Sequence, residues 1–176
     1  MPYHLMQAIK FRPMQIEDIP SVHAIDLLSF TMPWPEKSYH FELTQNPSTL
    51  AVVAELNQQN TGPAVIGMAV VWMILDEAHI ATIAIHPDFR GVGLGKSLLA
   101  ETLRLCILRG ATLATLEVRE SNLTAQGMYS NFGFKVVGRR SHYYADKNED
   151  AILMTIDGLS THSLKWLANI TRTHRS

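Results

Sequence analysis

The fold is decided by residues 80–99, IATIAIHPDFRGVGLGKSLL. The first part is an apolar, partly β-branched run that predicts a buried strand ending before Pro87, and the last part predicts a helix. Between them stands the turn Arg90–Gly95, in which three glycines alternate with other residues. Glycines between a strand and a helix let backbone amides approach an anion, and the helix N-terminus adds about half a positive charge. The stretch therefore predicts a pyrophosphate-binding turn.

Known glycine patterns narrow the choice of phosphate ligand. A P-loop ends in Gly-Lys-Ser or Gly-Lys-Thr, which residues 95–97 match, but Arg90 stands where the first P-loop glycine belongs. A dinucleotide fingerprint has the spacing Gly-x-Gly-x-x-Gly, which the strictly alternating Gly91, Gly93 and Gly95 break. A glycine-rich turn that binds no phosphate stays open as a further reading.

A third pattern, Arg-x-x-Gly-x-Gly, is filled by Arg90, Gly93 and Gly95, and it resembles the acyl-coenzyme A loop of the Gcn5-related N-acetyltransferase (GNAT) superfamily. The resemblance continues downstream through residues 116–119 (LEVR), 121–122 (SN), 128–129 (MY) and 132–134 (FGF). Residues 30–38, 139–144 and 149–152 resemble the RimI-type branch, the ribosomal-protein alanine N-acetyltransferases. The similarity runs in order over residues 8–157.

The apolar runs predict an α/β (α+β) fold, a mixed sheet with helices on both faces. Strands are expected over residues 8–13, 50–56, 64–75, 80–85, 112–118, 134–140 and 150–156, and helices over 18–29, 36–45, the segment after the glycine turn, and 122–131. The GNAT resemblance implies a mostly antiparallel central sheet of about seven strands. The acetyltransferase domain is expected over residues 1–157. Residues 158–176 contain basic but no acidic residues and form an extension of unknown role, either docked on the domain or frayed.

Length, charge and cysteine content bound the class of protein. A chain of 176 residues fits one domain, and a net charge of −1 predicts neither a nucleic-acid nor a membrane partner. The single cysteine, Cys106, excludes an internal disulfide, is typical of a reducing compartment and is interpreted as a buried structural thiol. The first ten residues lack the apolar core of a secretory signal, and the longest apolar run, Ala64–Leu75, is too short to span a bilayer. A cytoplasmic protein is therefore expected.

The resemblance implies that the chain binds acetyl-coenzyme A (acetyl-CoA) as co-substrate. Backbone amides of the glycine turn would hold the pyrophosphate, although many relatives carry a second basic residue where this chain has Gly91. The pantetheine would lie along Ile83–Ile85, where a strand bulge would present an amide to the thioester oxygen; the sequence shows only the small Ala81 and Ala84. The cofactor-binding residues are expected to be Ile83, Ala84, Ile85, Arg90, Gly91, Val92, Gly93, Leu94, Gly95, Lys96 and Asn122.

Two side chains are candidates for the proton transfers that accompany attack of an amine on a thioester. Glu117 stands in an otherwise apolar strand, where composition alone indicates an ordinary solvent-facing residue, but RimI-type enzymes use the matching glutamate as proton acceptor. Tyr129 matches the superfamily tyrosine that protonates the leaving thiolate, with aromatic packing as its alternative role. Because no cysteine or Ser/His pair is well placed as a nucleophile, direct attack in a ternary complex is expected.

The acceptor side is assigned by resemblance to Trp34, Tyr143 and Tyr144, which would flank a peptide groove. The implied reaction is acetylation of a protein N-terminal α-amine, with a ribosomal protein as the target. A lysine or small-molecule amine as acceptor, and a non-catalytic acyl-CoA sensor, stay open as alternatives. His79 and His86 are interpreted as structural or solvated, and no histidine spacing predicts a metal site.

Overall fold

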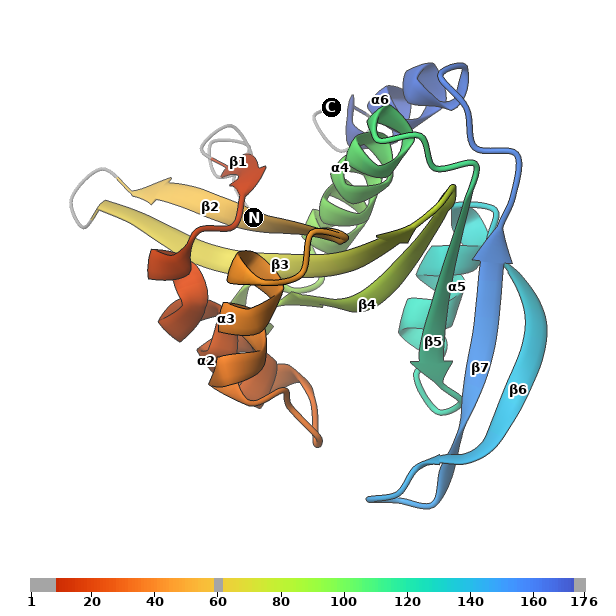
Figure 1. The fold of residues 1–176 in the computed structure, drawn as a ribbon, viewed down its shortest axis with the longest axis horizontal. Helices are drawn as coiled ribbons and strands as arrows, with labels where there is room; N and C mark the ends of the chain where they lie inside the picture. Colours follow the sequence, from red (N-terminus) through yellow and green to blue (C-terminus); the bar gives the residue numbers. More distant parts are fainter. Residues whose placement is uncertain (1–8, 59–61, 173–176) are drawn as a thin grey trace.

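Figure 1 shows the fold in the computed structural model, which describes residues 9–58 and 62–172. The strands are β1 (Ile9–Pro13), β2 (Thr49–Gln58), β3 (Gly62–Ile74), β4 (Glu77–Ile85), β5 (Leu113–Arg119), β6 (Lys135–Tyr144) and β7 (Glu149–Ile156). The helices are α2 (Ile19–Ser29), α3 (Glu36–Thr44), α4 (Leu94–Leu108), α5 (Leu123–Asn131) and α6 (Ser163–Arg172). All predicted strands and helices are present, although residue 8 and the hairpin tip 59–61 lie outside the described residues.

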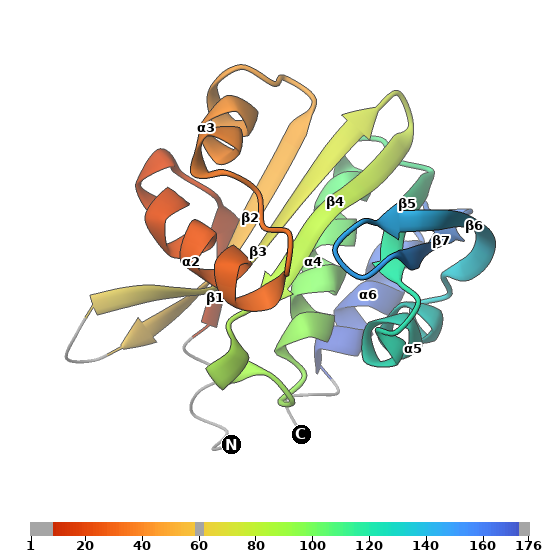
Figure 2. The same ribbon diagram turned by 90° about the horizontal axis from the view of Figure 1, so that it is seen from below.

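The strands form one seven-stranded sheet in the order β1-β2-β3-β4-β5-β7-β6. All neighbouring strands are antiparallel except β4 and β5, which are parallel. Helices α2 and α3 cover one face, while α4, α5 and α6 lie on the other (Figures 1 and 2). The predicted mixed, mostly antiparallel sheet with helices on both faces is therefore confirmed.

The sheet divides between β4 and β5. These two strands pair only along Glu77–Ile80 and Leu113–Leu116, and beyond that segment they separate (Figure 2). The second half of β4 keeps β3 as its neighbour on one side, and β5 keeps β7 on its other side. Beyond the paired segment, the facing edges of β4 and β5 form no ladder with each other. This unpaired part lies toward the end of α4 that carries the glycine turn.

A bulge at Ala81 interrupts β4, because two consecutive residues of β3 lie opposite Ile80 and Thr82. The extra residue reverses which face the side chains occupy. Ile80 packs in the core beneath α4, whereas Ala84, an even-numbered neighbour farther along, packs in the core beneath α2. The family-type bulge is thus present, just before the expected segment Ile83–Ile85.

The longest apolar run forms β3 and is buried through its centre. It was expected to be buried throughout, which is wrong at its end. Leu75 lies in the β3–β4 turn, with a φ of 56° and 95% of its surface exposed. No helix in the described ranges is long and apolar enough to cross a membrane.

The C-terminal extension docks on the domain as far as it is described. Leu159 and Leu167 are buried, and the ring of Trp166 meets Phe132 edge-on at 5.8 Å between centroids. Helix α6 packs along α4 (Figure 1). Of the two alternatives from the sequence, the docked one therefore holds for residues 159–169.

We expect the thiol of Cys106 to be unreactive in the folded protein. It is fully buried on α4, and burial raises its pKa to about 12. Since a raised pKa suppresses the thiolate, only about one thiol in ten thousand is ionised at pH 8. Titration with a thiol-reactive disulfide reagent should give almost no product in buffer and one equivalent in guanidinium chloride. Rapid labelling of the native protein would contradict the burial of this side chain.

Candidate active site

The glycine turn places two residues in the left-handed backbone region. Gly91 has a φ of 78°, and Gly93, the N-cap of α4, has a φ of 87°. The first bond of the helix runs from Ser97 N to Gly93 O at 3.2 Å. The amides of residues 94–96 consequently have no acceptor within the helix and point toward its N-terminal end. The turn has the local geometry of an anion site.

Arg90 uses its side chain to hold this turn in place. Its Nε donates to the backbone oxygen of Ile85 at 2.8 Å, and its terminal nitrogen donates to Ser29 Oγ at 2.8 Å. The guanidinium therefore joins the end of β4, the end of α2 and the turn. Cofactor binding by Arg90 stays a prediction, and two of the three nitrogens of its guanidinium already donate to groups of the protein itself.

The strand segment Ile83–Ile85 has one edge paired with β3 and the other turned toward the separation from β5. Close packing at its end depends on Gly67. A Cβ on Gly67 would lie 2.6 Å from Ile85 Cδ1 and 3.3 Å from the backbone oxygen of Ala84. The segment predicted to line the pantetheine therefore has one free backbone edge that a ligand can approach. Its other edge packs closely on β3 at Gly67.

Glu117 lies at the centre of a polar cluster on the sheet face covered by α2 and α3. Its side chain is 13% exposed, with Oε2 at 3.2 Å from His79 Nε2 and Oε1 at 3.4 Å from a guanidinium nitrogen of Arg140. The cluster lines a cavity of about 170 Å³. Glu117 is thus oriented through both of its oxygens, which does not fit the alternative from composition alone, an ordinary strand residue that faces solvent.

The hydrogen bonds of His79 define where its protons lie. Thr115 Oγ1 donates to the carboxylate of Glu77 at 3.0 Å, so the same oxygen accepts from His79 Nδ1 at 3.1 Å. With Nδ1 as a donor, Nε2 of the neutral ring is an acceptor facing a carboxylate oxygen. Thr115 therefore holds Nδ1 of His79, and Nε2 faces Glu117 Oε2 at 3.2 Å.

His79 was interpreted from the sequence as structural or solvated, and its contacts with Thr115 and Trp72 agree with a structural role, but its contact with Glu117 was not foreseen. The signal that could have found it is the alternation of Glu77 and His79 with the apolar Ala78 and Ile80, which puts both polar side chains on one face. That face is the one that carries Glu117. Arg140 was noticed only as part of the basic run 139–144.

Tyr129 belongs to the larger apolar core, the one that includes the buried side of α4. It is 7% exposed on α5, with its ring 5.8 Å from that of Phe134. Burial raises the pKa of its phenol to about 12, and the neighbouring Tyr144 adds to the shift. Tyr129 therefore remains protonated across the neutral range.

Asn122, another predicted cofactor residue, caps α5. Its Oδ1 accepts from Ala125 N at 3.1 Å, the N-cap arrangement expected from the sequence. Its carbonyl oxygen is thereby engaged. Any contact with a cofactor would use the side-chain amide nitrogen or the backbone.

A row of stacked rings leads from Trp34 toward Glu117. Trp34 stacks on Trp72 at 6.0 Å, and Trp72 stacks on His79 at 5.5 Å. The backbone amide of Trp34 donates to the buried carboxylate of Asp26 at 2.6 Å, which fixes the connection between α2 and α3. The predicted acceptor residue Trp34 and the predicted base therefore belong to one continuous surface.

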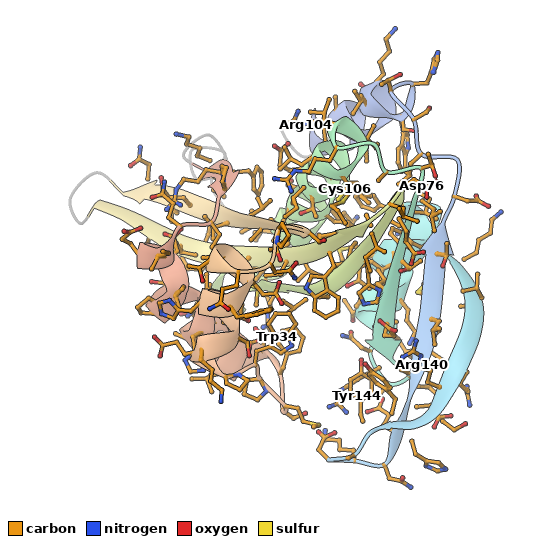
Figure 3. All side chains as sticks on the ribbon, viewed as in Figure 1. Trp34, Asp76, Arg104, Cys106, Arg140 and Tyr144 are labelled. Carbon is orange, nitrogen blue, oxygen red and sulfur yellow. The ribbon has the colours of Figure 1, made fainter. Side chains whose placement is uncertain are left out.

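Tyr143 and Tyr144 lie on the opposite side, at the end of β6. Their rings meet edge-on at 5.1 Å, Tyr143 lies beneath Arg140 and Tyr144 beneath Arg119. The pairing of β6 with β7 is irregular between Arg140 and Tyr144, which turns both tyrosines. Figure 3 shows Trp34 on one side of the separated strands, with Arg140 and Tyr144 on the other.

The predicted residues thus form three groups: the turn at the start of α4, the buried Tyr129, and the polar cluster around Glu117 between Trp34 and the two tyrosines. Within residues 9–58 and 62–172, no group of three or more His, Cys, Asp or Glu side chains could hold a metal ion.

Comparison with known proteins finds the same fold and a similar sequence. The sequence model of the Acetyltransferase (GNAT) family matches residues 19–134. The chain is 31% identical over 154 residues to the ribosomal protein bS18-alanine N-acetyltransferase of Escherichia coli K12, covering 81% of this chain and 93% of that one. It is 39% identical over 145 residues to a Bacillus subtilis protein that carries the same name provisionally, with 82% and 93% covered.

Solved structures agree. The crystal structure of the E. coli ribosomal-protein-S18-alanine N-acetyltransferase has a TM-score of 0.75 at 30% identity, covering 85% of this chain and 94% of that one. Ard1 from Thermoplasma volcanium has a TM-score of 0.76 at 27% identity, with 87% and 99% covered. At 22% identity, a chain of the NatC complex bound to Gag peptide and CoA shares the fold, with a TM-score of 0.74 and 85% and 98% covered.

The left-handed glycine of the turn provides a direct test of the anion site. In Gly93→Ala, the Cβ would strain the φ of 87°, so the N-terminal turn of α4 should reorganise and the dissociation constant for coenzyme A should rise about tenfold. Calorimetric titration with coenzyme A would measure the change.

The matched control is Gly110→Ala, at the other end of α4. Gly110 has a φ of 94°, and a Cβ added to it would meet no heavy atom within 4 Å, so this variant should carry the same backbone strain without touching the turn. It should lose stability but keep its affinity. Equal affinities for all three proteins would rule out the turn as the phosphate site.

Proposed function

The chain belongs to the acetyltransferase (GNAT) family, and from that premise we propose that it transfers the acetyl group of acetyl-CoA to the α-amine of a protein N-terminus. The first candidate acceptor is the N-terminal alanine of a ribosomal protein, the substrate named for the relatives that this chain matches over nearly their whole length. The observation that carries the proposal is the oriented carboxylate of Glu117. It lies between two predicted walls of the acceptor site, the Trp34 wall and the tyrosine wall of Tyr143 and Tyr144.

The chemistry of the acceptor favours an α-amine. With a pKa near 8, about one α-amine in ten is neutral at pH 7, against on the order of one lysine in 2,500. Only the neutral amine attacks a thioester. A site with one carboxylate in a small polar cluster therefore suits an α-amine better than a lysine.

The residues of the turn fit a coenzyme A pyrophosphate. Two left-handed glycines and the start of a fifteen-residue helix present several backbone amides without side chains in the way. Bound acetyl-CoA supplies an activated thioester. The segment Ile83–Ile85, unpaired toward β5, would hold the pantetheine, and the bulge at Ala81 lies directly beside it.

Glu117 is proposed to take the proton of the attacking amine, directly or through a water in the adjoining cavity. His79 and Arg140 hold its two oxygens and so fix its direction. The amine proton would move to the Glu117 carboxylate and from there to the acceptor nitrogen Nε2 of His79, which lies 3.2 Å from Oε2. Trp34, Tyr143 and Tyr144 would bind the first residues of the acceptor.

Tyr129 is proposed to protonate the leaving sulfur. Because a phenol with a pKa of about 12 is a weaker acid than a thiol with a pKa of about 8.5, transfer to a free thiolate would be uphill. The proton must therefore move while the carbon–sulfur bond is breaking, with the phenolate recovering its proton afterwards. Its burial among apolar side chains keeps water from competing for that role.

The test is acetyl transfer to short peptides that begin with alanine and contain one internal lysine. One peptide has a free N-terminus and the other an acetylated one; mass spectrometry locates the product and thiol release gives the rate. Product on the free α-amine alone supports the proposal. Product on the lysine, or only on polyamines offered in parallel, would replace it with another acceptor class, and coenzyme A binding without any transfer would indicate a sensor.

Glu117→Gln should lower kcat by about a hundredfold or more, because the amide cannot accept the amine proton. The KM for acetyl-CoA should stay unchanged, since Glu117 lies away from the turn. The matched control is Glu120→Gln. Glu120 is exposed, lies just past the end of the same strand and forms an ion pair with Arg139. If Glu120→Gln lost as much activity as Glu117→Gln, the loss would be electrostatic and general, and Glu117 would not be the base.

The pH dependence should reflect the high pKa of Tyr129. Its acid form is the active one, and that form is lost only as the pH rises through about 12. The kcat of the native enzyme should therefore show no alkaline decline up to about pH 10. Tyr129→Phe should lower kcat across the whole range. A decline centred below pH 9 that disappears in Tyr129→Phe would contradict the assigned pKa.

A further inference from the structure

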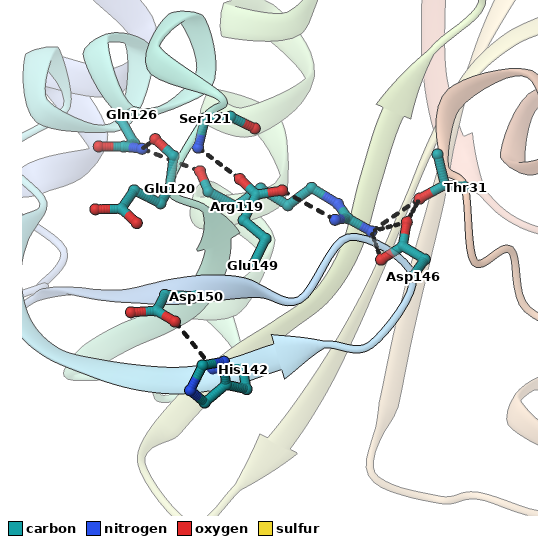
Figure 4. Close-up of polar contacts among 9 residues, drawn as sticks. All are labelled: Thr31, Arg119, Glu120, Ser121, Gln126, His142, Asp146, Glu149 and Asp150. Atoms are coloured by element: carbon teal, nitrogen blue, oxygen red, sulfur yellow. Dashed lines mark hydrogen bonds and ion pairs between the residues drawn. The ribbon is translucent and has the colours of Figure 1, made fainter.

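One guanidinium, that of Arg119 at the end of β5, contacts two segments that are far apart in the sequence (Figure 4). One terminal nitrogen donates to Thr31 Oγ1 at 2.8 Å and to both oxygens of Asp146 at 2.9 Å. The other donates to Glu149 Oε2 at 3.1 Å. Thr31 also donates its hydroxyl to Asp146. Both terminal nitrogens of this side chain are therefore engaged within the protein.

The connected segments are the two walls of the proposed acceptor site. Thr31 lies in the connection between α2 and α3, three residues before Trp34. Asp146 lies in the β6–β7 turn, shortly after Tyr143 and Tyr144. The contacts of Arg119 and Asp146 with Thr31 therefore join the Trp34 wall to the tyrosine wall.

The connection also crosses the division of the sheet. The helices α2 and α3 pack on β3, β4 and β2, whereas Arg119 and Asp146 belong to the β5–β7–β6 side. Because β4 and β5 pair only along Glu77–Ile80, nothing in the sheet ladder fixes their spacing farther on. The hydrogen bonds of Thr31 with Arg119 and Asp146 fix the distance between the two sides of the division next to the proposed acceptor site.

Arg119 is itself held firmly. Its backbone oxygen accepts from Gln126 Nε2 at 3.0 Å, and the guanidinium lies 4.0 Å over the ring of Tyr144. Glu149 accepts from the amide of Ser121 at 2.7 Å, which fixes the second carboxylate. The guanidinium therefore has a fixed position, and both walls are held relative to it.

The charges persist at neutral pH. Hydrogen bonds from Thr31 and Arg119 lower the pKa of Asp146, and those from Ser121 and Arg119 lower the pKa of Glu149. Since the depressed pKa values keep both carboxylates ionised, the contacts weaken only as the pH falls into the acidic range. Exposed ion pairs of this kind contribute little to overall stability, so their effect is one of geometry.

We propose that Thr31, Arg119 and Asp146 form a tie that sets the width of the acceptor groove, with Arg119 as a positioning residue that acts through the two walls. The proposal rests on the proposed function, because it assigns the tie to acceptor binding. Arg119 and Glu117 are two positions apart on one strand, so their side chains share a face and the tie borders the proposed base.

The sharpest variant is Thr31→Val, which removes only the hydroxyl. It disconnects the α2–α3 wall and leaves the contacts of Arg119 with Asp146 and Glu149 in place. The KM for an alanine-initiated peptide should rise about fivefold, while the KM for acetyl-CoA stays unchanged. Thr31→Ser keeps the hydroxyl and should restore the native KM.

The matched control is Thr112→Val, which removes another exposed threonine–aspartate hydrogen bond. Thr112 Oγ1 donates to Asp76 at 2.7 Å, across the end of the sheet where β4 begins. This variant should keep both KM values. Hydrogen exchange of residues 30–35 and 144–149 should be faster in Thr31→Val than in the native protein, and unchanged in Thr112→Val.

Three results would overturn the tie. They are an unchanged peptide KM in Thr31→Val, an equal rise in the KM for the peptide and the KM for acetyl-CoA, or a peptide KM in Thr31→Ser that stays as high as in Thr31→Val. Failure of the proposed function looks different, because the native protein itself would then acetylate no peptide α-amine. In that event hydrogen exchange decides on the tie alone: unchanged exchange of residues 144–149 in Thr31→Val would show that the walls are not coupled.

Discussion

The limited pairing of β4 with β5 is the constraint on which the rest of the structure depends. A parallel ladder that stops at Ile80 and Leu116 leaves two backbone edges facing each other without bonds. Each half of the sheet is completed by other partners, β3 on one side and β7 on the other. The molecule can therefore keep a divided sheet at its centre, with the glycine turn at one end of the division and the two proposed acceptor walls on one face.

Two independent cores make this division tolerable. One lies beneath α4, α5 and α6, and the other between the sheet and α2 with α3. The bulge at Ala81 directs consecutive parts of β4 into both cores, so the strand beside the division is anchored from each face. The proposed base Glu117 is oriented by His79 from the neighbouring strand β4 and by Arg140 from β6 on its own side, and the Arg119 tie crosses the division nearby.

Much of the candidate site could be predicted from residue patterns. The glycine turn, the capping role of Asn122 and the burial of Cys106 follow from local chemistry, and the structure confirms their geometry. The partners of Glu117 could not be predicted, because His79, Glu117 and Arg140 come from three different strands, and β7, the last strand of the chain, lies in the sheet between those of Glu117 and Arg140. The engagement of the Arg90 side chain with Ser29 is likewise a contact between distant segments.

The sequence by itself determined the family, the sheet with helices on both faces, and the turn at the start of α4, because apolar periodicity and glycine spacing act over a few neighbouring residues. Only the tertiary structure decided where β4 and β5 part, that His79 meets Glu117, and that Thr31 meets Arg119 and Asp146. Those features arise from strand register and from contacts between segments tens of residues apart, and no local pattern encodes either.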